Sequence, residues 1–277
     1  MKKVITLFPL VFICLLIQAQ QADSVPSIKK VTFTSGVGFN SHLNYYGRTD
    51  SLKSQAIYPF AGIALHNGLY VFSNVIFINN AMATTYAATT LEAGYKFKNK
   101  KENWKGNIFG SRFFYTADVN LVQSVVKEQA GINLSNTNKV LSVNGGADVK
   151  FSSQTDFGAY AGVNHAFRID PVGKKGVLII TPSAYGYFGT QRFSKTYMQE
   201  KRLLLIPVSS QAVTQNSSSF NIMSYELSCP VIYGYGKMNI IVIPAYVMPQ
   251  NVITANGSSS QKADNLFYTT AAVRFDF

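Results

Sequence analysis

The chain has 277 residues, of which 47% are hydrophobic and 13% aromatic but only 14% charged. Soluble domains average about 25% charged residues. So low a charge with so many aromatic residues argues against disorder, and it suits a sheet with one face toward lipid and one toward water. The formal net charge is +12, but the basic residues fall in turns such as 96–101 and 173–175. We therefore expect no nucleic acid as a partner, and a basic rim that can meet the phosphates of lipopolysaccharide and other outer-membrane lipids.

The first nineteen residues read as a secretory signal peptide. Lys2 and Lys3 precede an apolar run over residues 4–17, and Ala19 supplies the small residue of a cleavage site. The run contains Pro9 and falls short of the roughly 20 residues that a transmembrane helix needs. Its removal lowers the charge to +10 and leaves Cys229 as the only cysteine. We expect residues 20–30 to be a periplasmic lead, and neither a disulfide nor a cofactor is expected.

The rest of the chain, residues 31–277, repeats the apolar-out, polar-in alternation of membrane-spanning strands. Since no run is long enough for a membrane helix, the pattern predicts an all-β, transmembrane, antiparallel up-and-down β-barrel of about 12 strands. The sixth segment is ambiguous between a strand and an amphipathic helix in a loop. An even strand number, with both termini in the periplasm, favours a strand there. The expected strands cover residues 31–40, 56–65, 69–79, 86–97, 104–116, 119–131, 139–151, 157–169, 177–189, 220–233, 237–248 and 266–277.

The connections divide into short turns and long loops. Asn67-Gly68 predicts a two-residue hairpin, and residues 98–103 and 170–176 are expected as further periplasmic turns. The longest connections, 41–55, 190–218 and 250–265, are assigned to the outside. Whether 190–218 narrows a pore or binds a partner stays open. Three prolines inside strands predict local bulges or bends, namely Pro182, Pro230 and Pro244.

Eight charged residues fall on the inward face of the predicted strands. Both signs are present, so three interpretations are open: ion pairs that fill or narrow the lumen, a selectivity ring for a passing solute, or paired carboxylates acting as acid and base. The eight are Glu92, Lys96, Asp148, Lys150, Arg168, Glu226, Arg274 and Asp276.

An enzyme is not expected, although one alternative keeps the possibility. A membrane lipid hydrolase needs a serine beside a histidine, and the chain has no Gly-x-Ser-x-Gly elbow. His42 falls in an outer loop, His66 in a periplasmic turn and His165 on the lipid-facing register. The three cannot form one site, so His165 is interpreted as an interfacial residue.

The chain resembles the small, uncharacterised, porin-like outer-membrane barrels of Bacteroidetes-type Gram-negative bacteria. The residues that carry this resemblance are Gln18-Ala19-Gln20, 150–158, Gly189-Thr190-Gln191-x-Phe193, Tyr225-Glu226-Leu227-Ser228-x-Pro230, Pro244-x-Tyr246-x-Met248-Pro249 and the final Phe277. The resemblance implies a bacterial outer-membrane location, and Phe277 as the signal read by the barrel-assembly machinery. It implies no catalytic residues.

Three functions are consistent with the sequence: a channel or transporter for small solutes, a closed-lumen scaffold or surface-binding protein, and an outer-membrane lipid hydrolase. The channel is the first hypothesis.

Overall fold

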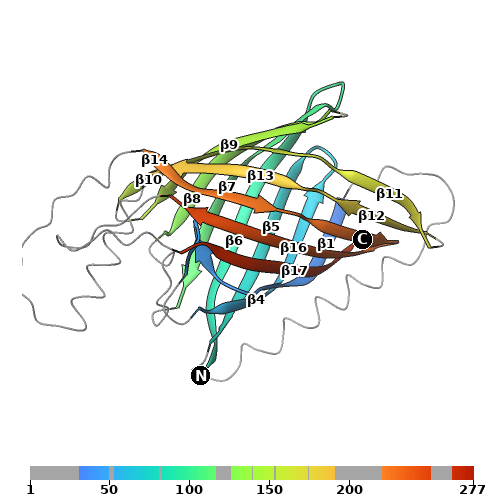
Figure 1. Cartoon of the computed structure of the whole chain (residues 1–277). Coiled ribbons are helices and arrows are strands. Elements are labelled where there is room, and N and C mark those ends of the chain that lie inside the picture. Colours follow the sequence, from blue (N-terminus) through green and yellow to red (C-terminus); the bar gives the residue numbers. More distant parts are fainter. Residues whose placement is uncertain are drawn as a thin grey trace, which may run out of the picture. The chain divides into compact units, whose positions relative to one another are not determined.

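A computed structural model (Figure 1) describes residues 31–49, 53–80, 83–116, 126–138, 140–152, 154–173, 175–190, 220–250 and 264–277. The predicted signal peptide and periplasmic lead, residues 1–30, lie outside the described residues, as do 191–219 and 251–263 of the predicted long loops. Within the described ranges, no helix has the length and apolar character needed to cross a membrane.

The described chain is built from strands. They are β1 (Val31–Asn40), β2 (Asn44–Tyr45), β3 (Arg48–Thr49), β4 (Gln55–Leu65), β5 (Leu69–Asn79), β6 (Thr84–Lys98), β7 (Trp104–Tyr115), β8 (Glu128–Asn136), β9 (Ser142–Phe151), β10 (Thr155–Asn164), β11 (Phe167–Val172), β12 (Gly176–Ile180), β13 (Ser183–Gly189), β14 (Asn221–Ser228), β15 (Val231–Tyr235), β16 (Met238–Pro249) and β17 (Leu266–Asp276).

These strands close into a 12-stranded antiparallel barrel. The ring runs β1, β4, β5, β6, β7, β8, β9, β10, β13, β14, β16, β17 and back to β1. Closure comes from the β1–β17 ladder, in which Val37 pairs with Val273. Three ring positions continue past a short break, because β11 extends β10, β12 leads into β13, and β15 extends β14. The predicted fold class, an all-β antiparallel barrel of about twelve strands, is confirmed.

Prolines lie at two of the three breaks. Pro182 separates β12 from β13, and Pro230 separates β14 from β15. Backbone hydrogen bonds still join the neighbouring strands at these breaks. Thr181 N–H donates to Pro230 O (2.8 Å), and Cys229 N–H donates to Pro244 O (3.1 Å). Pro244 itself interrupts nothing and pairs with Thr269 inside β16. The strands are thus interrupted at Pro182 and Pro230, whereas Pro244 causes no break in its ladder. Bends or bulges at the three prolines stay a prediction.

The sixth strand exists, but its predicted bounds of 119–131 are wrong. It is β8, which pairs with β7 through Ile108 and Ile132 and ends at Asn136. The alternation that matters is Ile132 and Leu134 outward against Asn133 and Ser135 inward, and it continues five residues beyond the predicted end. Residues 117–125 lie outside the described residues.

Two turns differ from their predictions. At 66–68 the turn has three residues: Gly68 N–H donates to Leu65 O (3.0 Å), and only Gly68 has a positive φ, +99°. A turn followed by one left-handed glycine is the three-residue hairpin loop, not the two-residue Asn-Gly loop. The predicted 170–176 turn begins too early, because β11 continues through Val172 with an irregularity after Ile169.

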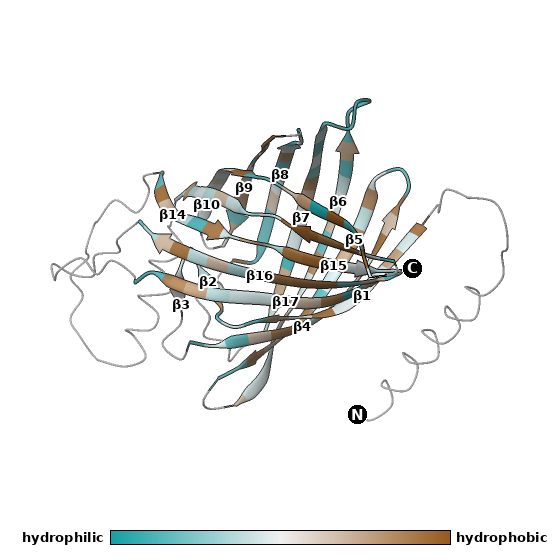
Figure 2. Ribbon diagram, turned by 45° about the vertical axis from the view of Figure 1, so that its right-hand side comes forward, coloured by the Kyte–Doolittle hydropathy of each residue, from teal (hydrophilic) through white to brown (hydrophobic). Residues whose placement is uncertain are grey.

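Glycines let aromatic rings lie flat against the inner wall. A Cβ atom added to Gly36 would sit 2.5 Å from Cζ of Phe60, and one added to Gly94 would sit 2.7 Å from Cε1 of Tyr70. Glycine is therefore required at both positions by close approach. The inner wall is thus partly aromatic. Figure 2 shows hydrophobic bands on strands throughout the barrel.

Candidate functional site: the barrel interior

The connection between β1 and β4 is a hairpin inside the barrel. Strands β2 and β3 pair through Asn44 with Thr49 and Tyr45 with Arg48. Tyr46 and Gly47 form the turn with φ values of +52° and +82°, the double positive φ of a type I′ turn. Residues 41–55 were expected as an outer polar loop; of these, the described residues 44–49 lie at that end of the strands but turn inward. We call this end, opposite the C-terminus in Figure 2, the hairpin end, and the other the turn end.

The hairpin is held against the wall by close packing. A Cβ on Gly47 would lie 2.6 Å from Cγ of Pro249 and 3.0 Å from Cγ1 of Val247, two fully buried residues of β16. On the other side the Tyr46 ring lies 5.7 Å from the Tyr187 ring of β13. Burial, followed by the neighbouring Tyr46 and by Asp148 and Asp156, raises the pKa of the Tyr45 phenol above its ordinary value. The phenol of Tyr45 is therefore neutral at physiological pH.

A cavity of about 340 Å³ lies beside the hairpin. We call it the hairpin cavity. Its lining includes Phe109 of β7 and Val247 of β16, strands that lie on opposite sides of the ring. The cavity therefore spans the lumen. Other lining residues are Asn44, Tyr45, Tyr46, Gln129, Asn133, Asp148, Lys150, Tyr160, Tyr187, Ser224 and Glu226.

Tyrosines form a connected cluster around the hairpin cavity. The centroid of the Tyr160 ring lies 6.0 Å from that of Tyr185 and 6.2 Å from that of Tyr187. Tyr46 joins the cluster through Tyr187, and Tyr45 joins through Tyr46 at 4.4 Å. These separations are typical of favourable aromatic pairs. The cluster joins the hairpin to the wall and presents ring faces to the lumen.

Two charged side chains near the hairpin neutralise each other. Lys150 and Asp148 form an ion pair, with side-chain exposures of 9% and 17%. Asp156 is buried close by and accepts a hydrogen bond from the Thr190 hydroxyl (2.6 Å). Glu226 accepts one from the Tyr268 hydroxyl (3.1 Å). Among the described contacts near the hairpin, three carboxylates, those of Asp148, Asp156 and Glu226, thus stand against the one ammonium group of Lys150.

A hydrogen-bonded chain crosses the middle of the lumen wall. The Tyr70 hydroxyl donates to Glu92 (2.8 Å) and accepts from Asn107 Nδ2 (3.1 Å). Asn107 Oδ1 accepts from Asn133 (3.2 Å), and Asn133 Oδ1 accepts from the Tyr160 hydroxyl (3.0 Å). Side chains of β5, β6, β7, β8 and β10 are joined in this way, and such satisfied networks hold their members in place.

A second cavity, of about 620 Å³, opens from this chain toward the turn end. We call it the mouth cavity. It is lined by the 66–68 turn and by Lys96, Lys98 and Lys105, and it shares Asn133 and Tyr160 with the hairpin cavity. Glu102 forms an ion pair with Lys98, whose hydrogen bond lowers the pKa of that carboxyl. The turn end of the lumen is therefore basic.

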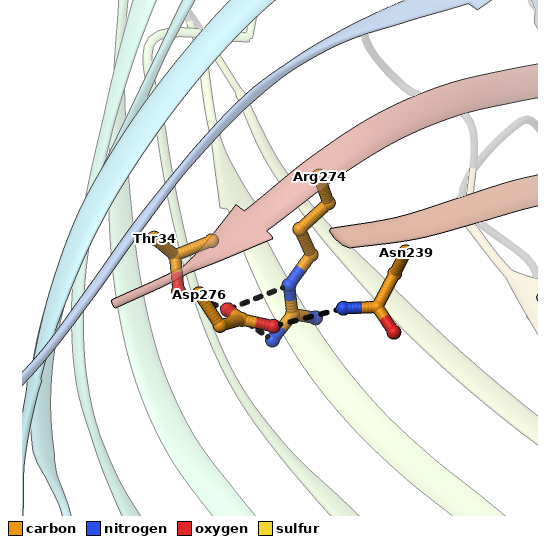
Figure 3. A network of polar contacts seen from close by, with 4 residues as sticks. All are labelled: Thr34, Asn239, Arg274 and Asp276. Carbon is orange, nitrogen blue, oxygen red and sulfur yellow. Dashed lines mark hydrogen bonds and ion pairs between the residues drawn. The ribbon is translucent and has the colours of Figure 1, made fainter. Parts of the chain in front are cut away.

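The barrel seam carries its own polar network (Figure 3). Asp276 accepts hydrogen bonds from Thr34 of β1 (2.7 Å) and Asn239 of β16 (3.1 Å), and it pairs with Arg274 at 2.8 Å. These contacts tie the first strand to the last two. The Arg274–Asp276 ion pair and its hydrogen bonds therefore stabilise the closed barrel.

The eight predicted lumen residues do not form one ring. Asp148, Lys150 and Glu226 line the hairpin cavity and Lys96 lines the mouth cavity. Glu92 accepts a hydrogen bond from Tyr70, and Arg274 pairs with Asp276 at the barrel seam. Arg168 lies apart from them. It belongs to β11, which continues β10 beyond the level at which the neighbouring strand β9 begins. The Arg168 side chain is 62% exposed and forms an ion pair with Asp170. An inward register is therefore not enough to place it in the lumen.

The histidines lie apart, as expected. His42 Nδ1 is 3.2 Å from Ser41 Oγ at the hairpin end, and His66 lies in the turn at the other end. The His165 ring packs against Phe167 with centroids 4.5 Å apart. A triad needs a base bonded both to a nucleophile and to an orienting group, and the described contacts of His165 include neither.

The sequence reasoning missed the inward hairpin, the tyrosine cluster and Ser224. The Tyr46-Gly47 pair is a weak hairpin signal, and Tyr160, Tyr185 and Tyr187 share an inward register with the polar residues around them. Aromatic residues of a barrel are expected at the two ends of its outer surface, so these signals alone do not predict an inward cluster.

No protein-family model matches the sequence, and no curated protein sequence matches it. Among solved structures, the chain is similar to the KdgM porin (8% identity, TM-score 0.49, covering 89% of this chain and 99% of that one). It is also similar to the COG4313 outer membrane channel from Pseudomonas putida F1 (11%, 0.48, 92% and 100%) and to the NanC porin (10%, 0.45, 88% and 98%). At these identities and TM-scores the comparison does not assign a function. The resemblance to Bacteroidetes-type barrels stays a prediction.

Proposed function

We propose that the protein is an outer-membrane channel for small hydrophilic solutes, narrowed by the β2–β3 hairpin. The observation that carries the proposal is the hollow lumen. The hairpin cavity and the mouth cavity have Asn133 and Tyr160 in common among their lining residues, so hollow space lies on both sides of these residues, toward the hairpin and toward the turn end. Most of the lining side chains are polar, although Phe109 and Val247 also line the hairpin cavity and Phe97 and Leu134 the mouth cavity.

The outer surface supports a membrane location. Large hydrophobic side chains are exposed on strands around the barrel, for example Ile63 (49%), Ile108 (54%), Leu227 (51%) and Phe267 (60%). Soluble monomers rarely expose apolar patches of more than a few hundred Å². A closed barrel satisfies its backbone polar groups internally, so such a surface is stable in lipid. Outer-membrane lipids and lipopolysaccharide are the partners proposed for it.

The unequal ends support an orientation. Val31 and Phe277 both lie at the turn end, where Phe277 N–H donates to Phe33 O (2.8 Å). The connections described at that end are short, whereas the strand ends that border residues 191–219 and 251–263, namely Gly189, Asn221, Pro249 and Leu266, lie at the hairpin end. Long external loops and short periplasmic turns are the usual asymmetry, so we assign the turn end to the periplasm. The role of Phe277 as an assembly signal stays a prediction.

Conductance in planar lipid bilayers tests the proposal. The wild-type protein is compared with a variant in which residues 43–53 are replaced by a short Gly-Ser linker. We expect stepwise currents from both, with a larger unit conductance for the variant because it lacks the constriction. A folded variant that carries no current would contradict a channel.

The closed-lumen scaffold is the second candidate. It is favoured by the hydrogen-bonded chain from Glu92 to Tyr160, which fixes side chains along the lumen wall, and by the hairpin docked inside the barrel. The same recordings separate the two candidates, because a scaffold carries no current with or without its hairpin.

A further inference from the structure

Ser224 has an unsatisfied hydroxyl in the wall of the hairpin cavity. The residue is 1% exposed, and its Oγ has no hydrogen-bond partner in the described part of the chain. It pairs across the ladder with Tyr187, so both side chains lie on the inner face of the wall. A buried polar group without a partner costs about 1–3 kcal/mol. The cavity therefore suits an occupant that can hydrogen-bond to Ser224.

The surroundings of Ser224 combine ring faces with hydrogen-bonding groups. Tyr46, Tyr160 and Tyr187 line the cavity, and rings of this kind give a flat apolar surface with a polar edge. Glu226 accepts hydrogen bonds, while the Gln129 amide both donates and accepts them. A solute that fits has an apolar face of C–H groups and a rim of hydroxyls, as a sugar has.

The charges of the cavity decide against an anion. Lys150 is its lining cation, and this side chain is already paired with Asp148. Glu226 remains without a cationic partner among the described ion pairs, since its described partner is the Tyr268 hydroxyl. A carboxylate brought next to Glu226 would be repelled, and the repulsion is stronger in a lumen than in bulk water.

We propose that the hairpin cavity binds a neutral, polyhydroxylated solute of the sugar class, stacked on Tyr187 and hydrogen-bonded to Ser224 and Glu226. The volume of about 340 Å³ lies at the lower end of the range of about 300–1,000 Å³ for small-molecule sites, so the solute is a small sugar. The binding site rests on the proposed function only for the route by which that solute arrives.

Equilibrium binding to the detergent-solubilised full chain tests the site without requiring conductance. Isothermal titration calorimetry with glucose and with glucuronate compares two ligands that differ by one carboxylate. We expect glucose to bind and glucuronate to bind at least about tenfold more weakly. Glu226→Gln should narrow this difference, because it removes the repelling charge.

Two variants test the named contacts. Ser224→Ala and Tyr187→Ala should each raise the Kd for glucose about fivefold, as expected for one hydrogen bond or one stacking contact. Ser183→Ala is the control for the serine: its Oγ donates to Thr181 O (2.9 Å) and lines neither cavity. Tyr233→Ala, also outside both cavities, is the control for the ring. Circular dichroism checks that every variant is folded.

The outcomes separate the site from the channel. Glucose binding without conductance would retain the site and sink the channel. Conductance with no binding of glucose would overturn the site and retain the channel. If folded Ser224→Ala and Tyr187→Ala bind glucose as well as the wild type, water alone satisfies Ser224 and the proposal is wrong.

Discussion

Replacement of Gly47 by alanine should release the hairpin from the barrel wall. Gly47 is buried at the tip of the hairpin with a φ of +82°. The new Cβ would lie 2.6 Å from Cγ of Pro249 and 3.0 Å from Cγ1 of Val247. Neither neighbour can move away readily, because both are fully buried and one is a proline ring. The hairpin itself is therefore the part that shifts.

The size of the effect follows from two costs. A left-handed φ costs a residue other than glycine about 1–2 kcal/mol, and overpacking a buried contact costs about 1–3 kcal/mol. If the turn survives, the left-handed φ costs the docked and the displaced hairpin the same free energy. The collision with Pro249 and Val247 is therefore what shifts the equilibrium between these two states. A shift of about 2 kcal/mol raises the displaced population nearly thirtyfold.

Single-channel recording measures this population directly. Gly47→Ala should spend more time at a higher conductance level than the wild type. Gly236→Ala is the matched control, since Gly236 also has a positive φ, +59°, but an added Cβ meets nothing within 4 Å. The reasoning would be refuted by wild-type currents from a folded Gly47→Ala protein. Equal changes in both variants would show that backbone strain acts without the collision.

Two further predictions concern charged residues. Lys150→Met should lower the free energy of unfolding by about 3 kcal/mol because it leaves Asp148 buried without its partner. Arg112→Met removes one member of a pair that is more than 40% exposed, so it should cost about 1 kcal/mol or less. Urea titrations in detergent compare the two variants, and equal losses of unfolding free energy would contradict the burial argument. Lys105→Glu should shift the reversal potential in a KCl gradient toward cation selectivity, since Lys105 lines the mouth cavity. The control Lys175→Glu lies in the turn between β11 and β12 and should leave the reversal potential unchanged. A shift of the same size in the control would contradict a role of Lys105 in ion selectivity.

The sequence predicted the strands well because the barrel imposes a simple rule on them. One face of each strand meets an apolar surface and the other meets the interior, so hydropathy alternates with a period of two. The predicted bounds of β1 and β5 match the structure, and most others differ by a few residues. The errors arose where that rule is weak. The start of β8 and the extension through β11 depend on pairing partners, which lie far away in the chain.

The candidate site was predicted only in outline. Alternation predicted Glu92, Asp148, Lys150 and Glu226 on the inner face; in the structure the last three line the hairpin cavity, and Glu92 accepts a hydrogen bond from Tyr70. It could not say that Lys150 pairs with Asp148 while Glu226 meets Tyr268, because partners at the same height of a barrel are set by strand register. Arg168 is a second example: alternation predicts which face of the strand it lies on, but not that its position along the barrel axis is beyond the end of the neighbouring strand.

The sequence by itself determined that the chain is a barrel with an apolar outside, since periodicity and composition are properties of each strand alone. Only the tertiary structure decided what the barrel encloses. The hairpin at 44–49 turns inward because Gly47 fits against Val247 and Pro249, and Tyr46 packs against Tyr187 inside the barrel. Those contacts join residues separated by more than a hundred positions. They exist only once the ring has closed and brought β13 and β16 beside the hairpin between β1 and β4.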